Sequence, residues 1–136
     1  MPPVYVDTGI WVALLDAADQ HHDRAKRIIQ DHQAAGFVSS DLVVGEAVTL
    51  LRRSAGPKVA ADFARDVLDH QTCEMVRTEE TDWRKGMDLL EQYKEHRLSS
   101  TDAASFALIR RLDIKKVASF DKHFQIVLTE REVIGA

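Results

Sequence analysis

The chain has 136 residues, of which 45% are hydrophobic and 29% charged, with only six glycines and three prolines. It is too short for two ordinary domains and too apolar for a disordered segment, so we expect one compact domain over residues 1–136. The net charge of −4 excludes a protein that coats nucleic acid through bulk positive charge, so any nucleic-acid contact must be local.

The cysteine content and the amino terminus indicate a cellular compartment. Cys73 is the single cysteine, which excludes a disulfide within the chain and a thiolate zinc site, and suits a reducing environment. The first residues lack the basic start and apolar stretch of an export signal, and the longest apolar run, residues 10–15, is too short to span a membrane. We therefore expect a soluble, cytoplasmic protein without membrane contact.

Short apolar or β-branched runs alternate with longer segments of helical period, which predicts an α/β fold. The first half should contain a strand at 4–6, a helix from about residue 10 that Thr8 can cap, and a helix over about 23–34. A strand at 37–38 and a third helix, which begins near Ser40, should follow. The apolar stripe of this third helix consists of Val43, Ala47, Leu50 and Leu51.

The second half continues the alternation with a helix over about 58–69, a strand at 73–76 and a fifth helix that begins near Thr78 or Thr81. A sixth helix should begin at residues 99–101, and strands are expected at 116–119 and around 126–128. The side chains expected to face the core from the fifth and sixth helices are Trp83, Met87, Leu90, Phe106, Ile109 and Leu112. Parallel pairing with right-handed crossovers is the economical topology, and it places a ligand site at the carboxyl ends of the strands.

Four carboxylates interrupt this apolar pattern. Asp7 directly follows the first strand and Asp121 follows the strand at 116–119, so both lie where open α/β sheets bind ligands. Glu46 and Asp102 lie on the core-facing stripes of the third and sixth helices. Asp7 and Asp121 could each be turn residues and Asp102 could simply cap its helix, but Glu46 is too far from a helix end for that role.

A convergence of these acids would require compensation. Two carboxylates about 5 Å apart repel by about 3 kcal/mol at an effective dielectric constant near 20. A hard divalent cation offsets this repulsion, and oxygen-only ligands suit Mg²⁺ or Mn²⁺. Such an ion can activate water and neutralise charge on a phosphodiester, so the acids favour metal-dependent phosphodiester hydrolysis.

Four segments resemble, in order and spacing, the motifs of PIN-domain nucleases and, more narrowly, of the VapC-like toxins of bacterial and archaeal toxin–antitoxin pairs. The segments are VYVDTGIW (4–11), VGEA (44–47), LSSTDA (98–103) and SFDKHF (119–124). The resemblance implies a three-layer α/β/α sandwich with a mostly parallel sheet of four or five strands. It also implies an Mg²⁺- or Mn²⁺-dependent endoribonuclease, silenced by a cognate antitoxin protein and commonly homodimeric.

The same resemblance assigns the site residues. Those that match the family's catalytic and metal-binding acids are Asp7, Glu46, Asp102 and Asp121. Thr8 matches a hydroxyl position beside the first acid and would contact substrate, or would only cap a helix. Some members carry another acid soon after the fourth, whereas Lys122, His123 and Phe124 stand here, which argues against a fully occupied second metal site.

Other classes of protein fit the sequence less well. A haloacid dehalogenase-type phosphatase needs a second aspartate where Gly9 stands, and a receiver domain needs an acid pair near the first strand, where Asp7 is alone. The remaining alternative is a PIN-like domain that binds nucleic acid or a protein partner without cleavage.

The neighbouring His21 and His22 favour a solvated helix start over a metal site, and Trp11 is the aromatic residue we expect to contact a partner.

Overall fold

The computed structural model describes residues 1–136, and its centre is a five-stranded sheet in which every strand pair is parallel. The strands are β1 (Val4–Val6), β2 (Phe37–Ser40), β3 (Glu74–Val76), β4 (Lys116–Ala118) and β5 (Glu132–Ile134), in the order β3-β2-β1-β4-β5. The parallel α/β fold predicted from the sequence is therefore confirmed, with five strands.

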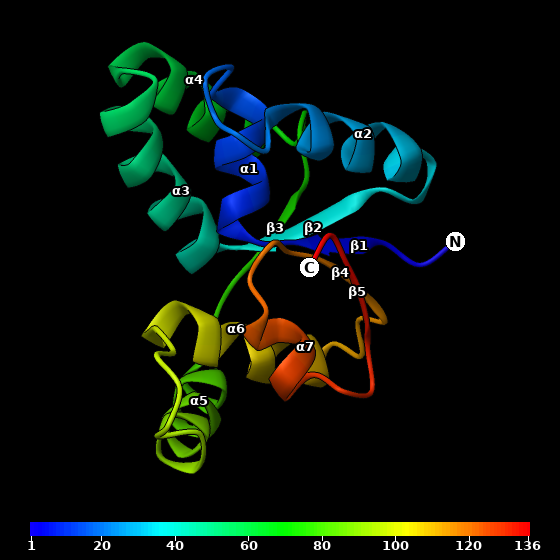
Figure 1. Ribbon diagram of the computed structural model, residues 1–136, viewed down its shortest axis with the longest axis vertical. Helices are drawn as coiled ribbons and strands as arrows, with labels where there is room; N and C mark the ends of the chain where they lie inside the picture. The colour runs from blue at the N-terminus through cyan, green and yellow to red at the C-terminus, as the bar shows by residue number, and fades with distance from the viewer.

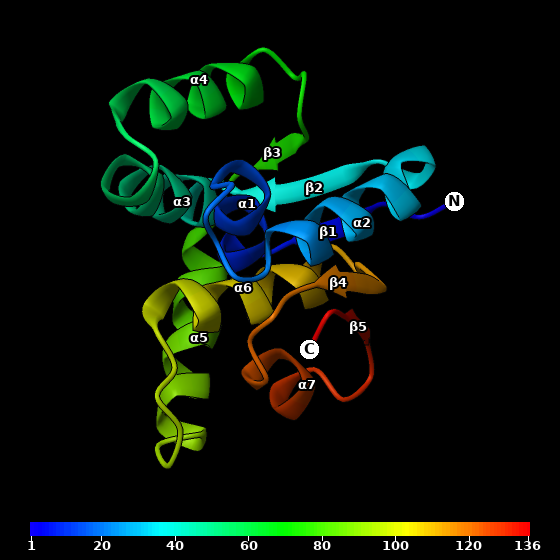
Figure 2. The ribbon, with the colours of Figure 1, turned by 45° about the horizontal axis from the view of Figure 1, so that its top comes forward.

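Helices cover both faces of this sheet (Figure 1). One face carries α1 (Thr8–Leu15), α2 (His22–His32), α3 (Asp41–Ser54) and α4 (Pro57–Leu68), with a short 3-10 turn at Gln33–Ala35. The other face carries α5 (Glu80–Gln92), α6 (Ser100–Arg111) and α7 (His123–Val127), and Figure 2 shows the same separation from a second direction. The expected three-layer α/β/α sandwich is thus confirmed.

The strand order fixes the place where a ligand can bind. The chain moves outward from β1 to β2 and β3, then crosses back to β4 on the other side of β1. In open parallel sheets, such a reversal opens a crevice beyond the carboxyl ends of the central strands. Val6 pairs with Ala118 at the last position of β1 and β4, so the residues that follow these two strands begin side by side.

The core explains why the first strand is central. All three residues of β1 are fully buried, which is typical of a parallel strand covered by helices on both faces. The Tyr5 hydroxyl donates to Ser105 Oγ at 2.9 Å. Trp11 is also buried, and its indole N–H donates to Ser39 Oγ at 3.2 Å, so our expectation that Trp11 contacts a partner is wrong.

Two predictions in the second half are wrong. Residues 126–128 belong to α7 and the turn after it, because Phe124, Val127 and Leu128 bury themselves at helical spacing; the last strand is β5. The buried face of α5 consists of Asp82, Gly86 and Leu89. The side chains wrongly expected to face the core from α5 and α6 are Trp83, Met87 and Leu112, which are exposed.

The inward face of α5 is explained by its contact with α6. Asp82 is 1% exposed and receives two hydrogen bonds of 2.9 Å from the Arg111 guanidinium, one on each carboxylate oxygen. Paired, bidentate geometry makes a buried carboxylate tolerable. At Gly86 the helices approach so closely that an added Cβ would lie 3.0 Å from the backbone nitrogen of Ala104. The position therefore requires glycine for packing.

We expect Gly86→Ala to reduce the free energy of unfolding by about 1–3 kcal/mol, because the new methyl group must push backbone atoms of α6 away. Gly45, in the middle of α3, has no atom within 4 Å of an added Cβ. Gly45→Ala is the matched control and should stabilise the protein by about 0.5–1 kcal/mol through helix propensity. Urea unfolding measures both, and an equal effect of the two substitutions would contradict the packing argument.

None of the seven helices is both long enough and apolar enough to cross a membrane.

Candidate active site

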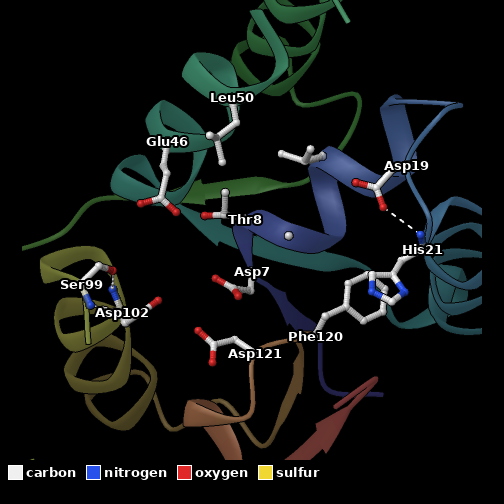
Figure 3. Close-up of a pocket in the computed structure, with 12 residues that line it drawn as sticks. Asp7, Thr8, Asp19, His21, Glu46, Leu50, Ser99, Asp102, Phe120 and Asp121 are labelled. Carbon is white, nitrogen blue, oxygen red and sulfur yellow. Dashed lines mark hydrogen bonds between the residues drawn. The ribbon is translucent and has the colours of Figure 1, made fainter. Parts of the chain in front are cut away.

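A pocket of about 480 Å³ opens at the carboxyl edge of the sheet (Figure 3). All four acids expected from the sequence lie on its wall, and each comes from a different segment: Asp7, Glu46, Asp102 and Asp121. Asp7 follows β1, Asp121 follows β4, Glu46 belongs to α3 and Asp102 to α6. The structure thus brings together carboxylates that lie far apart in the chain.

Asp7 is held at the floor of this pocket by the neighbouring strand. Its backbone N–H donates to the Ala118 carbonyl at 3.0 Å, and its Oδ2 accepts a 2.8 Å hydrogen bond from the buried hydroxyl of Ser119. The pKa of Asp7 is raised from 3.8 to about 7, mainly by burial and also by the charges of Asp102 and Asp121, which together outweigh the Ser119 hydrogen bond. The metal-free pocket therefore makes the Asp7 carboxylate costly to ionise.

Asp102 has two structural relationships at once. Its Oδ2 accepts from the backbone N–H of Ser99 at 3.2 Å, while Ser99 Oγ accepts from the Asp102 N–H at 3.0 Å, which is a capping box at the start of α6. Its side chain also reaches into the pocket (Figure 3). Burial raises the pKa of Asp102, with contributions from the charges of Asp121 and Glu46. Asp102 therefore both caps α6 and lines the pocket.

Asp121 and Glu46 complete the acidic wall. Asp121 Oδ1 accepts from the backbone N–H of His123 at 2.9 Å, and the backbone N–H of Asp121 donates to Ser119 Oγ at 3.0 Å. Glu46 lies on the second turn of α3 at a half-buried position, with Leu50 one turn further along the same wall. Leu50 and Glu46, expected to face the core, instead face the pocket.

The charge of the pocket fits a hard divalent cation. Five of its twelve lining residues are acidic, namely Asp7, Asp19, Glu46, Asp102 and Asp121, and none is lysine or arginine. No group of three histidine, cysteine or acidic side chains is already close enough together to coordinate a metal ion. The donor set is nevertheless oxygen-rich, and its negative charge has no compensating lysine or arginine on the pocket wall, which is the environment that Mg²⁺ and Mn²⁺ prefer.

Thr8 contributes a polar atom without a partner. It is the first residue of α1, whose N-cap position is Asp7, so Thr8 does not cap the helix as the sequence suggested. Its Oγ1 is buried and makes no hydrogen bond within the chain, although Thr8 lies on the pocket wall. An unpaired buried hydroxyl is costly, and a hydrogen bond from a group in the pocket would remove that cost.

Ser119 is the residue that sequence reasoning missed. Its hydroxyl donates to Asp7 and accepts from the backbone of Asp121, so one fully buried oxygen connects the acids at the ends of two strands. The signal was available in the SFDKHF motif, because its first residue is a polar side chain that directly follows the buried pair Val117 and Ala118. The link itself depends on the pairing of β1 with β4, which the sequence does not state.

We expect Ser119→Ala to weaken Mn²⁺ binding by about tenfold or more, because residues that orient metal ligands typically contribute 10–100-fold in affinity. Ser105→Ala is the matched control, since Ser105 is equally buried and hydrogen-bonded but contacts Tyr5. Calorimetric titration with Mn²⁺ gives both affinities. Equal affinities in the two variants would contradict an orienting role for Ser119.

The fold and this acidic pocket together define a class. Residues 4–127 match the PIN domain family, and the chain belongs to that family. The chain is 33% identical to the 23S rRNA-specific endonuclease VapC20 of Mycobacterium tuberculosis over 127 residues, 89% of this chain and 91% of that protein, in both strain CDC 1551 and strain H37Rv.

A solved structure agrees with the sequence comparison. The crystal structure of Mycobacterium tuberculosis VapC20, described as a sarcin-ricin loop cleaving toxin, superposes with a TM-score of 0.82 and 29% identity. The match covers 90% of this chain and 93% of that chain. The resemblance to PIN-domain nucleases and VapC-like toxins seen in the motifs is therefore confirmed.

Proposed function

We propose that the protein is a metal-dependent endoribonuclease that acts as the toxin of a toxin–antitoxin pair. The observation that carries this proposal is the pocket at the carboxyl edge of the sheet, whose wall is lined by five acidic residues and by no lysine or arginine. Membership in the PIN domain family and the 33% identity to an rRNA endonuclease support the same activity.

In this proposal, Asp7, Glu46, Asp102 and Asp121 hold Mg²⁺ or Mn²⁺ and form the catalytic centre. When bound, such an ion supplies charge neutralisation for the phosphodiester and acidifies a water molecule. Ser119 keeps the Asp7 carboxylate oriented, and the capping box fixes one oxygen of Asp102 so that its other oxygen is left for the pocket. The chain's own contribution is thus a set of carboxylates held from four segments.

Thr8 is proposed to contact the substrate. Its buried Oγ1 lacks a partner and lies on the pocket wall beside the acids. A hydroxyl can donate to a non-bridging phosphate oxygen without adding charge to the pocket. The contact would orient the scissile phosphate next to Asp7.

The substrate class follows from the relatives. Because VapC20 is named for cleavage of 23S rRNA and its structure is described as that of a sarcin-ricin loop cleaving toxin, we propose a ribosomal RNA loop as the target. An open pocket at a sheet edge suits an unpaired, exposed RNA segment, whose bases can turn outward.

We further propose a cognate antitoxin protein as partner, a homodimer as the working unit, and the cytoplasm as location. The toxin description of the VapC20 structure supports the antitoxin. Exposed apolar side chains, among them Leu68 on α4 and Trp83 on α5, are available for protein contacts. Light scattering of the antitoxin-free protein would reveal the dimer as twice the 15.3 kDa chain mass.

The test uses the purified, antitoxin-free protein and deproteinised 23S rRNA. Cleavage at a defined position in Mg²⁺ or Mn²⁺, lost in excess EDTA and restored by added metal, would support the proposal. The alternative is a PIN-like domain that binds nucleic acid or a protein without cutting. RNA binding in Mn²⁺ with no cleavage of any RNA would favour that alternative, and cleavage in EDTA would contradict the metal requirement.

A further inference from the structure

The pocket has a second, aromatic end. His21 and Phe120 both line it, and their rings stack with centroids 4.9 Å apart and planes inclined by 36°. Figure 3 shows this pair on the side of the pocket away from Glu46 and Asp102. Arg24 places its guanidinium carbon 5.1 Å from the centre of the Phe120 ring. A wall of two aromatic rings with a cation nearby thus adjoins the acids.

The His21 ring is free to interact with a ligand. Its backbone N–H donates to Asp19 Oδ1 at 2.8 Å, which fixes the loop before α2, but the ring itself makes no hydrogen bond within the chain. His32, at the other end of α2, is used structurally, because its Nδ1 lies 2.9 Å from the Ile28 carbonyl oxygen. The sequence interpretation placed His21 in a solvated helix start, whereas the structure also places its ring on the pocket wall against Phe120.

Phe120 connects this wall to the acids. It lies between Ser119 and Asp121, the two residues whose polar groups organise the carboxyl end of β4. Gly9, two residues after Asp7, is a close neighbour of the ring, because an added Cβ would stand 3.9 Å from Phe120, at ordinary contact distance. An occupant of the aromatic end therefore lies next to anything held by Asp7 and Asp121.

The chemistry of the two ends differs in a way that suits one nucleotide. The acidic end repels phosphate unless a cation is present, whereas the aromatic end can hold an uncharged group without one. A nucleobase is flat, apolar on its faces and polar at its edges, and stacking on protein aromatic rings is the usual way to hold it.

We propose that the wall formed by His21 and Phe120 is a nucleobase subsite, which holds the unpaired base of a nucleotide adjoining the cleaved phosphodiester. The base would stack against this wall, and Arg24, whose guanidinium donates to the Gly135 carbonyl, adds a positive charge beside the Phe120 ring. This inference rests on the proposed endoribonuclease function and adds to it the element that would select the cleavage position.

The test combines two variants with RNA that lacks a single base. His21→Ala removes the ring, Phe120→Leu keeps apolar volume but removes the aromatic face, and His32→Ala is the control outside the pocket. Synthetic target loops carry one abasic nucleotide at successive positions around the cleaved bond. We expect one abasic position to raise the KM of the wild type between about fivefold and a hundredfold, the range for loss of one base stack.

His21→Ala and Phe120→Leu should raise KM by similar factors on intact RNA and cause no further loss on that abasic substrate. Such non-additivity indicates a shared contact. A His21→Ala variant that behaves like His32→Ala, or that loses the same factor on intact and abasic RNA at every position, would overturn the proposal. So would a variant that changes only the affinity for the antitoxin.

A binding measurement separates this inference from the proposed function. Histidine ring NMR signals are recorded while a nucleoside monophosphate is added with Mg²⁺, and the base should shift the His21 signals while those of His32 stay in place. Cleavage of RNA without any shift of His21 would overturn the subsite and leave the nuclease function intact. A His21 shift in a protein that cleaves no RNA would support the subsite and contradict the nuclease function.

Discussion

Asp7→Asn should reduce Mg²⁺- or Mn²⁺-supported RNA cleavage by about a thousandfold while the fold remains intact. Asparagine keeps the size of the side chain and one carbonyl oxygen but removes the charge that attracts the cation. Loss of metal-supported charge stabilisation can raise the activation barrier by several kcal/mol, which corresponds to this factor in rate. The carbonyl oxygen of the new amide can still accept the hydroxyl of Ser119, so the link between β1 and β4 survives.

Asp62→Asn is the matched control, because Asp62 is a partly exposed acid on α4 that pairs with Lys58, away from the pocket. It should retain wild-type cleavage. Thermal melts in EDTA report on the fold, and melts in Mn²⁺ report on metal binding. The Tm of Asp7→Asn should be no lower than that of the wild type in EDTA, and Mn²⁺ should raise it by less. Undiminished cleavage by Asp7→Asn would contradict a role of this carboxylate in the reaction.

The stability of the metal-free protein should fall as pH rises from about 4 to about 7. Asp7 has a pKa of about 7 in the folded protein and an ordinary value of 3.8, because burial disfavours its charged form. The folded state therefore binds more protons than the unfolded state in this window, so each rise in pH favours unfolding until Asp7 is ionised in both states. The gap between the two pKa values corresponds to at most about 4 kcal/mol. The raised pKa of Asp102 acts in the same direction.

Urea unfolding in EDTA at several pH values between about 4.5 and about 8 measures this effect, because that interval spans the titration of a buried carboxyl group. Subtracting the curve of Asp7→Asn cancels groups that titrate alike in both proteins. The variant should lose most of the slope and be more stable than the wild type at the alkaline end. Parallel curves would show that Asp7 ionises in the folded protein as it does in the unfolded chain.

The central strands and the order of the acids were predictable because local chemistry determines them. The apolar segment Val4–Val6 has the composition of a buried parallel strand. A residue directly after such a strand lies at the carboxyl edge of the sheet, where ligands bind. The role of Glu46 was predictable because an unpaired carboxylate on the apolar stripe of a helix is costly to bury. These signals are contained in short windows of sequence.

Other features depend on contacts between distant segments. The bond from Arg111 to Asp82 and the close approach at Gly86 determine which face of α5 packs inward. The larger apolar residues Trp83 and Met87 therefore lie on the exposed face. The link from Ser119 to Asp7 needs the register of two strands from opposite ends of the chain. The approach of His21 to Phe120 joins the start of α2 to the end of β4 in the same way.

The capping box of α6 has a consequence for anyone who needs an inactive form of this protein. Because Asp102 accepts the Ser99 N–H while it lines the pocket, Asp102→Ala removes a pocket charge and loosens the start of α6 together. The bond from the Asp102 backbone to Ser99 Oγ would survive, but loss of the other capping-box bond typically costs about 0.5–1.5 kcal/mol, so poor yield and lost activity would be confounded in that variant. Asp7, whose side chain closes no helix end, is the cleaner choice for a harmless protein in which antitoxin and RNA binding can be studied.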